Sequence, residues 1–226
     1  MTTQHPLFPI GLNEIERARA LLFDGPDGPV AIRTPLIPAD PLSSQLGCRV
    51  WLKLENLQKT GSYKIRGAFN NIANLTPEQA AAGIVTASAG NHAQGVALAA
   101  AAFGIADRTT VFVPVGTPKV KQDNTRGYGV DVREIGENFD AARSHAYDEA
   151  AASGRVFIEP FDDWQPIAGQ GTVGLEILDD LPGTAAILSP VGGGGLIAGI
   201  ALAIAGRGAP VRIIGVEAEG AACLIW

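Results

Sequence analysis

Cysteine and clusters of basic residues are scarce in this chain. Cys48 and Cys223 are the only two cysteines in 226 residues. Two thiols at this length do not make a disulfide framework, so a reducing, cytoplasmic environment is the simplest expectation. The formal net charge of −6, with no run of Lys and Arg, argues against nucleic acid or an anionic membrane surface as the main partner.

Aromatic residues and long apolar runs are also few. Aromatic residues make up 6% of the chain, whereas glycine occurs 28 times, a combination that suits close packing of helices on sheets. The most apolar stretch, residues 196–205, has roughly half the length of a bilayer span, and we expect a buried helix there. Residues 1–6 lack the basic and apolar regions of a signal peptide.

Short apolar segments alternate with alanine-rich segments through most of the chain, which predicts a parallel sheet covered by helices. The expected strands are residues 49–55, 83–87, 109–114, 131–135, 156–158, 185–190 and 211–217. The expected helices are residues 14–22 (capped by Asn13), 68–75 (following the Lys64 segment), 91–103, 118–128, 139–153, 169–178 and 195–205, with a further helix start at Thr76 and Pro77. A cluster of turn residues at 25–29 follows the first helix.

Lys64 stands among small and apolar residues, in the segment Thr60-Gly61-Ser62-Tyr63-Lys64-Ile65-Arg66-Gly67. Burial disfavours the ammonium form and lowers the pKa of a lysine, which makes its amine available as a nucleophile or base. The alternative is a helix residue whose charged end reaches water. The segment alone leaves both interpretations open.

Four consecutive glycines, Gly192, Gly193, Gly194 and Gly195, lie between an apolar strand and an apolar helix. Without Cβ atoms, successive backbone N–H groups can converge on an anion, and the helix N-terminus adds its positive dipole end. This pattern predicts a phosphate site, with a plain tight turn as the alternative. The glycines and Glu217 also partly fit a dinucleotide fingerprint.

A second loop, Ser88-Ala89-Gly90-Asn91-His92, lies between another strand and helix and suits a bound carboxylate. The alternative is ordinary capping by Ser88 or Asn91, with His92 exposed. Asp162 and Asp163 are interpreted as a solvated cap. The two cysteines lack metal-ligand spacing, so no metal site is expected.

Together these segments resemble the serine/threonine dehydratase (threonine ammonia-lyase) family, which are pyridoxal 5′-phosphate (PLP) enzymes of fold type II. The resemblance is carried, in the family's order, by residues 55–68, 87–95, 167–172, 190–196 and 215–219. It implies an α/β fold of the tryptophan synthase β type, with two parallel-sheet layers flanked by helices. The implied domains are a large PLP-binding domain (residues 1–70 and 160–226) and a small substrate-binding domain (residues 71–159).

The resemblance also implies a role for each matching residue. Lys64 would hold PLP as a Schiff base and act on the substrate Cα proton, and Tyr63 would pack against the cofactor ring. Asn91 would donate to the 3′-oxygen, and Gly192 to Gly195 would hold the 5′-phosphate. The substrate carboxylate would be bound by Ser88, Ala89, Asn91 and His92.

The implied reaction is α,β-elimination of L-threonine, L-serine or both to 2-oxobutyrate or pyruvate plus ammonia. Ala89 stands where related serine racemases carry a second acid/base serine, and a methyl group moves no proton, so elimination is expected over racemisation. The alternatives are an inactive fragment of such an enzyme and a dinucleotide-binding module. The implied partner is a small amino acid, and the oligomeric state, a homo-oligomer included, is left open.

Family members continue beyond residues 215–219, so we expect this chain to lack the C-terminal part of the large domain. Cys223 occupies the place where some relatives bind a cation through an acidic residue, and the apolar tail at 224–226 carries no capping or turn signal. A parallel sheet without its last strands exposes an edge and an apolar face. We therefore expect the isolated chain to be poorly soluble or weakly active.

Overall fold

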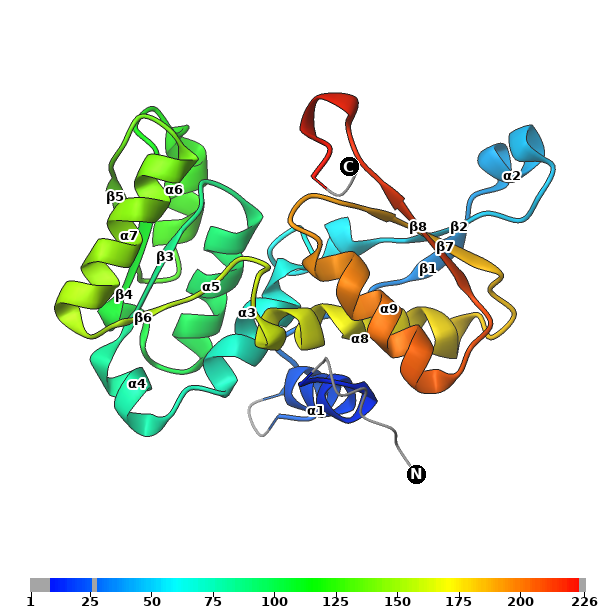
Figure 1. The fold of residues 1–226 in the computed structure, drawn as a ribbon, viewed down its shortest axis with the longest axis horizontal. Coiled ribbons are helices and arrows are strands. Elements are labelled where there is room, and N and C mark those ends of the chain that lie inside the picture. Colours follow the sequence, from blue (N-terminus) through cyan, green and yellow to red (C-terminus); the bar gives the residue numbers. More distant parts are fainter. Residues whose placement is uncertain (1–8, 26–27, 224–226) are drawn as a thin grey trace.

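The computed structural model describes residues 9–25 and 28–223. Its helices are α1 (Leu12–Phe23), α2 (Asp40–Leu46), α3 (Lys64–Ala73), α4 (Pro77–Ala82), α5 (Asn91–Ala102), α6 (Lys119–Arg126), α7 (Phe139–Ser153), α8 (Trp164–Asp180) and α9 (Gly195–Arg207). Its strands are β1 (Leu36–Pro38), β2 (Trp51–Lys53), β3 (Ile84–Ala87), β4 (Thr109–Val113), β5 (Asp131–Glu134), β6 (Val156–Phe157), β7 (Ala186–Pro190) and β8 (Arg212–Val216). Figure 1 shows two groups of these elements side by side, with α3 between them.

A parallel four-stranded sheet forms one of these groups, together with α4 to α7 (Figure 1). The strand order is β5-β4-β3-β6, and every residue of β3 and β4 is buried. Strands buried on both faces are typical of a parallel sheet covered by helices. The predicted alternation of strands and helices in residues 83–158 is therefore confirmed.

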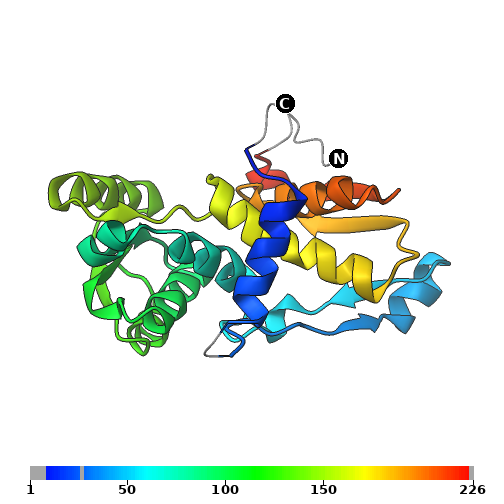
Figure 2. The ribbon, with the colours of Figure 1, turned by 90° about the horizontal axis from the view of Figure 1, so that it is seen from below.

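The other group is built around α8 and α9. Figure 2 shows α1 lying across α8, where a Cβ atom on Gly171 would stand 2.8 Å from Cδ1 of Ile15. Strands β7 and β8 pair in parallel, and Ile187 and Ile213 on one face pack into the cluster formed by α8 and α9. This pair is the second predicted parallel layer. Strands β1 and β2 form a separate antiparallel pair.

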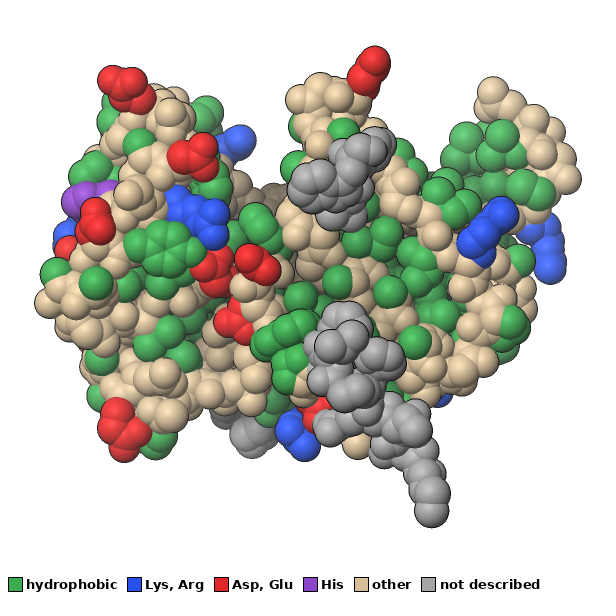
Figure 3. Space-filling model, in the orientation of Figure 1, with side chains coloured by type: hydrophobic (Ala, Val, Ile, Leu, Met, Phe, Trp, Pro, Cys, Tyr) green, Lys and Arg blue, Asp and Glu red, His purple; other side chains and the backbone are tan. Residues whose placement is uncertain are grey.

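The opposite face of β7 and β8 is apolar and open to solvent. Leu188 is 66% exposed and Val216 is 52% exposed. Hydrophobic side chains are also at the surface over α2, where Leu42 and Leu46 are exposed (Figure 3). The expected exposed apolar face is thus present among the described residues.

Three local expectations were wrong or incomplete. Asn13 does not cap α1, because the helix begins at Leu12, two residues before the expected start, and the N–H of Gly11 donates to Glu14 Oε2 at 2.8 Å. Helix α8 begins at Trp164, five residues before the expected start, because the side chain of Asp163 accepts from the N–H of Gln165 at 2.9 Å. Strand β1 and helix α2 were not predicted.

Some expectations fall outside the described residues: the N-terminal segment 1–6, part of the turn at 26–27 and the tail at 224–226. Within the described ranges, no helix combines the length and the apolar character that a membrane crossing requires.

Candidate active site

Lys64 is the first residue of α3, and its side chain is partly buried. Its Nζ donates to the carbonyl oxygen of Pro160 at 2.7 Å. The same atom lies 5.5 Å from the ring centroid of Tyr63 and 5.8 Å from that of Phe161, within the range of cation–π attraction. Burial lowers the pKa of Lys64 from 10.5 to about 8. Lys64 is therefore not an ordinary surface lysine whose charged end lies in water.

The loop of residues 88–92, which suits a bound carboxylate, lies beside Lys64, and a glycine in the helix that follows makes the close contact. A Cβ atom on Gly95, in α5, would stand 3.1 Å from the carbonyl carbon of Lys64, so the backbones of the two helices approach closely at this glycine. Ser88 and Ala89 are half-buried, and Asn91, the first residue of α5, is exposed. The first N–H groups of a helix lack intrahelical partners, so this end of α5 offers donors close to Lys64.

The His92 side chain is buried, not exposed as the capping interpretation expects. Its Nε2 lies 3.1 Å from Thr86 Oγ1 and 3.2 Å from the carbonyl oxygen of Ile158. Burial, together with the positive charge of Lys64, lowers the pKa of His92 to about 3, against the opposing effect of the Ile158 carbonyl. The imidazole is therefore neutral at physiological pH.

The glycine loop leads directly into α9. Gly194 precedes the helix with φ of 81°, a left-handed conformation that favours glycine. A Cβ atom on Gly193 would stand 2.2 Å from Cγ of Phe161, so the loop lies against this ring. At Gly192 and Gly194, no atom of the described residues is within 4 Å of the place a Cβ would take. The loop thus has one packed side and one open side.

The segment 158–161, after β6, joins these groups. Its carbonyl at Ile158 contacts His92, and its carbonyl at Pro160 accepts from Lys64. Its ring at Phe161 is close to both the Lys64 amine and Gly193. Sequence reasoning placed Ile158 in a strand and noted Phe161 only as part of the motif with Asp162 and Asp163, so it missed the contacts that this segment makes. The available signal was a proline and an aromatic residue between a strand and a capped helix.

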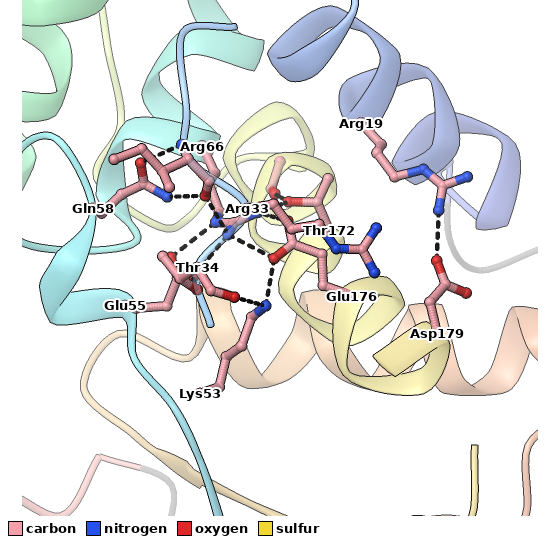
Figure 4. A network of polar contacts seen from close by, with 12 residues as sticks. Arg19, Arg33, Thr34, Lys53, Glu55, Gln58, Arg66, Thr172, Glu176 and Asp179 are labelled. Atoms are coloured by element: carbon pink, nitrogen blue, oxygen red, sulfur yellow. Dashed lines mark hydrogen bonds and ion pairs between the residues drawn. The ribbon is translucent and has the colours of Figure 1, made fainter. Parts of the chain in front are cut away.

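A buried ionic network also escaped the sequence analysis (Figure 4). Arg66, two residues after Lys64, is fully buried and forms ion pairs with Glu55 at 2.7 Å and Glu176 at 2.6 Å. Burial acts to lower the pKa of Arg66, but hydrogen bonds and charge attraction from the two glutamates outweigh it, so the net shift is upward. The available signal was a second charged residue beside Lys64 in a segment of small and apolar residues.

Residues 29–225 match the family described as pyridoxal-phosphate dependent enzyme. The chain is 51% identical over 189 residues to an L-threonine ammonia-lyase of Geobacter sulfurreducens, covering 84% of this chain and 46% of the relative. It is 46% identical over 216 residues to an L-threonine ammonia-lyase of Thermotoga maritima, covering 96% of this chain and 52% of the relative. The chain thus spans about half the length of these curated relatives.

Solved structures give the same fold. Threonine deaminase isoform 2 of Solanum lycopersicum is similar with a TM-score of 0.84 and 42% identity, over 93% of this chain and 61% of that one. Maize serine racemase is similar with a TM-score of 0.85 and 33% identity, over 94% and 64%. These likenesses confirm the expected type II fold and the resemblance to the dehydratases. With a family match across residues 29–225, the chain belongs to the pyridoxal-phosphate-dependent enzymes.

Proposed function

We propose that this chain carries the cofactor lysine and substrate loop of an ammonia-lyase that dehydrates L-threonine, L-serine or both. The observation that carries the proposal is the position of the Lys64 amine. It is partly buried between two aromatic rings, with a pKa lowered to about 8, and the first turns of α5 lie next to it. The similarity to L-threonine ammonia-lyases supports the substrate class.

The residues present fit PLP. Lys64 offers an amine with a lowered pKa, which is what reaction with an aldehyde requires. The open side of the loop from Gly192 to Gly195 offers backbone N–H groups at the start of α9, which suit a phosphate. We assign Tyr63 to the cofactor ring, since its own ring lies beside the Lys64 amine, and Asn91 to the 3′-oxygen.

Bound PLP supplies an electron sink for the charge that develops at the substrate Cα. With a pKa of about 8, Lys64 is neutral in an appreciable fraction of molecules near neutral pH and can accept the Cα proton. Loss of the β-hydroxyl as water, then hydrolysis, converts threonine to 2-oxobutyrate and ammonia.

The substrate carboxylate is assigned to the start of α5. Ser88, Ala89, Asn91 and His92 are the proposed contacts, with His92 acting through its backbone N–H because its Nε2 is already engaged by Thr86 and Ile158. The methyl group of Ala89 moves no proton, which favours elimination over the racemisation performed by the serine racemases that share this fold.

The proposed division of labour follows the two groups of elements. Residues 1–70 and 160–226 form the cofactor domain and residues 71–159 the substrate domain. A hydrophobic cluster running from α3 through α5 into the four-stranded sheet keeps them in contact. A cytoplasmic location and a homo-oligomer are compatible with this proposal.

The test is the visible absorbance of the purified chain mixed with PLP. A band of lysine-bound cofactor in the wild type, absent from Lys64→Ala, is expected, together with release of 2-oxobutyrate from threonine. A folded protein that shows the band but releases no 2-oxo acid is a cofactor-binding fragment without activity. A folded protein that shows no band and instead binds NAD contradicts the proposal and supports a dinucleotide-binding module.

A further inference from the structure

Arg66 has no role in the chemistry assigned above, yet its side chain makes several charge-assisted hydrogen bonds. Its Nε and Nη2 donate to the two carboxylate oxygens of Glu55 at 2.8 Å and 2.7 Å, a bidentate pair. Its Nη1 donates to Glu176 Oε1 at 2.6 Å and to Thr172 Oγ1 at 3.0 Å, and its Nη2 also donates to Glu176 Oε2 at 3.1 Å. One guanidinium thus holds the start of α3 to residues after β2 and to α8 (Figure 4).

The centre of the network is buried, since the Arg66 and Glu176 side chains are 0% and 1% exposed. Lys53, whose side chain is 7% exposed, supplies a second cation at 2.6 Å from Glu176, whose side chain is 1% exposed. The Lys53 Nζ also donates to the carbonyl oxygen of Thr34 at 2.7 Å. Lys53 also lies 3.7 Å from Asp180, which itself pairs with Arg33. Each charge of the network therefore has a partner of opposite sign. The contacts act as a tether.

The backbones of α3 and α8 also touch. A Cβ atom on Gly169 would stand 2.4 Å from the carbonyl oxygen of Arg66, and one on Gly67 would stand 2.8 Å from that of Pro166. Helix α8 starts three residues after Phe161. Phe161 belongs to the segment 158–161, whose Pro160 carbonyl oxygen accepts the hydrogen bond from the Lys64 amine. Side-chain ion pairs and backbone contacts together fix the first turn of α3 relative to this segment.

We propose that Arg66 is a positioning residue for Lys64, holding the lysine backbone so that its amine reaches the cofactor. The inference rests on the proposed function. A buried ion-pair network is a weak source of stability compared with apolar packing of the same volume. Its fixed directions, in contrast, suit the placement of a reactive side chain, for which misplacement by about 1 Å costs about a hundredfold.

The test replaces Arg66 with lysine, which keeps the charge but lacks the planar guanidinium that pairs with Glu55 through two parallel hydrogen bonds. The dissociation constant of PLP is measured from its lysine-bound absorbance, well below the unfolding temperature of each variant. A second measurement, on protein without cofactor, follows acetylation of Lys64 by acetic anhydride against pH, using mass spectrometry. Arg66→Lys is expected to raise the dissociation constant about tenfold to a hundredfold. It is also expected to move the midpoint of acetylation upward from about 8.

The matched control is Arg19→Lys. Arg19 pairs with Asp179 of α8 at 2.9 Å, but at the surface and far from the first turn of α3 (Figure 4). Both readouts are expected to stay at their wild-type values in this variant. Glu55→Gln, which removes one charge and keeps the shape, serves as the second variant if Arg66→Lys does not fold.

Each outcome decides the proposal. A folded Arg66→Lys, or a folded Glu55→Gln in its place, with wild-type PLP affinity and a wild-type acetylation midpoint overturns it. If both variants are unfolded, the network serves folding alone, and the proposal is likewise overturned. If the wild type shows no lysine-bound PLP, the proposed function fails, while the acetylation measurement still decides whether Arg66 positions Lys64.

Discussion

The Nζ atom of Lys64 donates a hydrogen bond of 2.7 Å to the carbonyl oxygen of Pro160, 96 residues further along the chain. This contact joins the start of α3 to the segment 158–161. The same segment contacts His92 through Ile158 and the glycine loop through Phe161. The Lys64 motif, the loop at residues 88–92 and the glycine loop at residues 192–195 are far apart in the sequence, and all three contact this short segment.

Lys64 should make the stability of the fold depend on alkaline pH. Its folded pKa of about 8 is below the ordinary 10.5, so the unfolded chain binds more protons between these values and the wild type gains stability as pH rises through them. Lys64→Met lacks this gain. Urea unfolding at several pH values should show the stability of the variant relative to wild type falling by about 3 kcal/mol at most. A difference independent of pH would contradict the lowered pKa.

His92 should make the fold less stable at acidic pH. Its folded pKa of about 3 is below the ordinary 6.5, so the unfolded chain takes up the proton first and the fold loses stability as pH falls from 6.5 towards 3. His92→Gln should lose less stability over this interval. In NMR spectra of the wild type, the ring proton shifts of His92 should stay constant between pH 5 and 7. Titration near 6.5 would show that the ring is exposed.

The glycine loop should tolerate a methyl group at one position and not at its neighbour. Gly193→Ala places a Cβ 2.2 Å from Cγ of Phe161, and we expect a loss of about 1–3 kcal/mol in the free energy of unfolding. Gly192→Ala, where no described atom is within 4 Å, is the matched control and should change stability little.

Phe161→Ala in the Gly193→Ala background separates packing from other causes. Removal of the ring should remove most of the penalty for the alanine, which a double-mutant cycle measures as a coupling between the two sites. Additive effects would mean that Phe161 does not account for the glycine at 193.

The exposed face of β7 and β8 should drive association of the isolated chain. Leu188→Lys places a charge on this face, where Leu188 is 66% exposed, and should reduce light scattering at rising protein concentration. The free energy of unfolding should change by about 0.5 kcal/mol or less. Ile187→Lys is the matched control on the opposite, buried face and should prevent folding. Equal scattering by wild type and Leu188→Lys would exclude this face as the site of association.

Much of the secondary structure could be predicted because its signals are local. Helix α7 has the predicted bounds, 139–153, and α4 begins at Pro77 after Thr76, as expected. The antiparallel pairing of β1 with β2 was missed, since each strand is three residues long and carries too little periodicity to predict a partner.

The sequence by itself determined the order of helices and strands apart from β1 and α2, the reactive-lysine motif and the two loops suited to anions, because each depends on neighbouring residues. Only the tertiary structure decided that His92 is neutral and bound to Ile158, that Phe161 lies close to both Lys64 and Gly193, and that Arg66 is tethered to Glu55 and Glu176. The physical reason is that most of these contacts join residues distant along the chain, and burial and pairing exist only once the helices have packed.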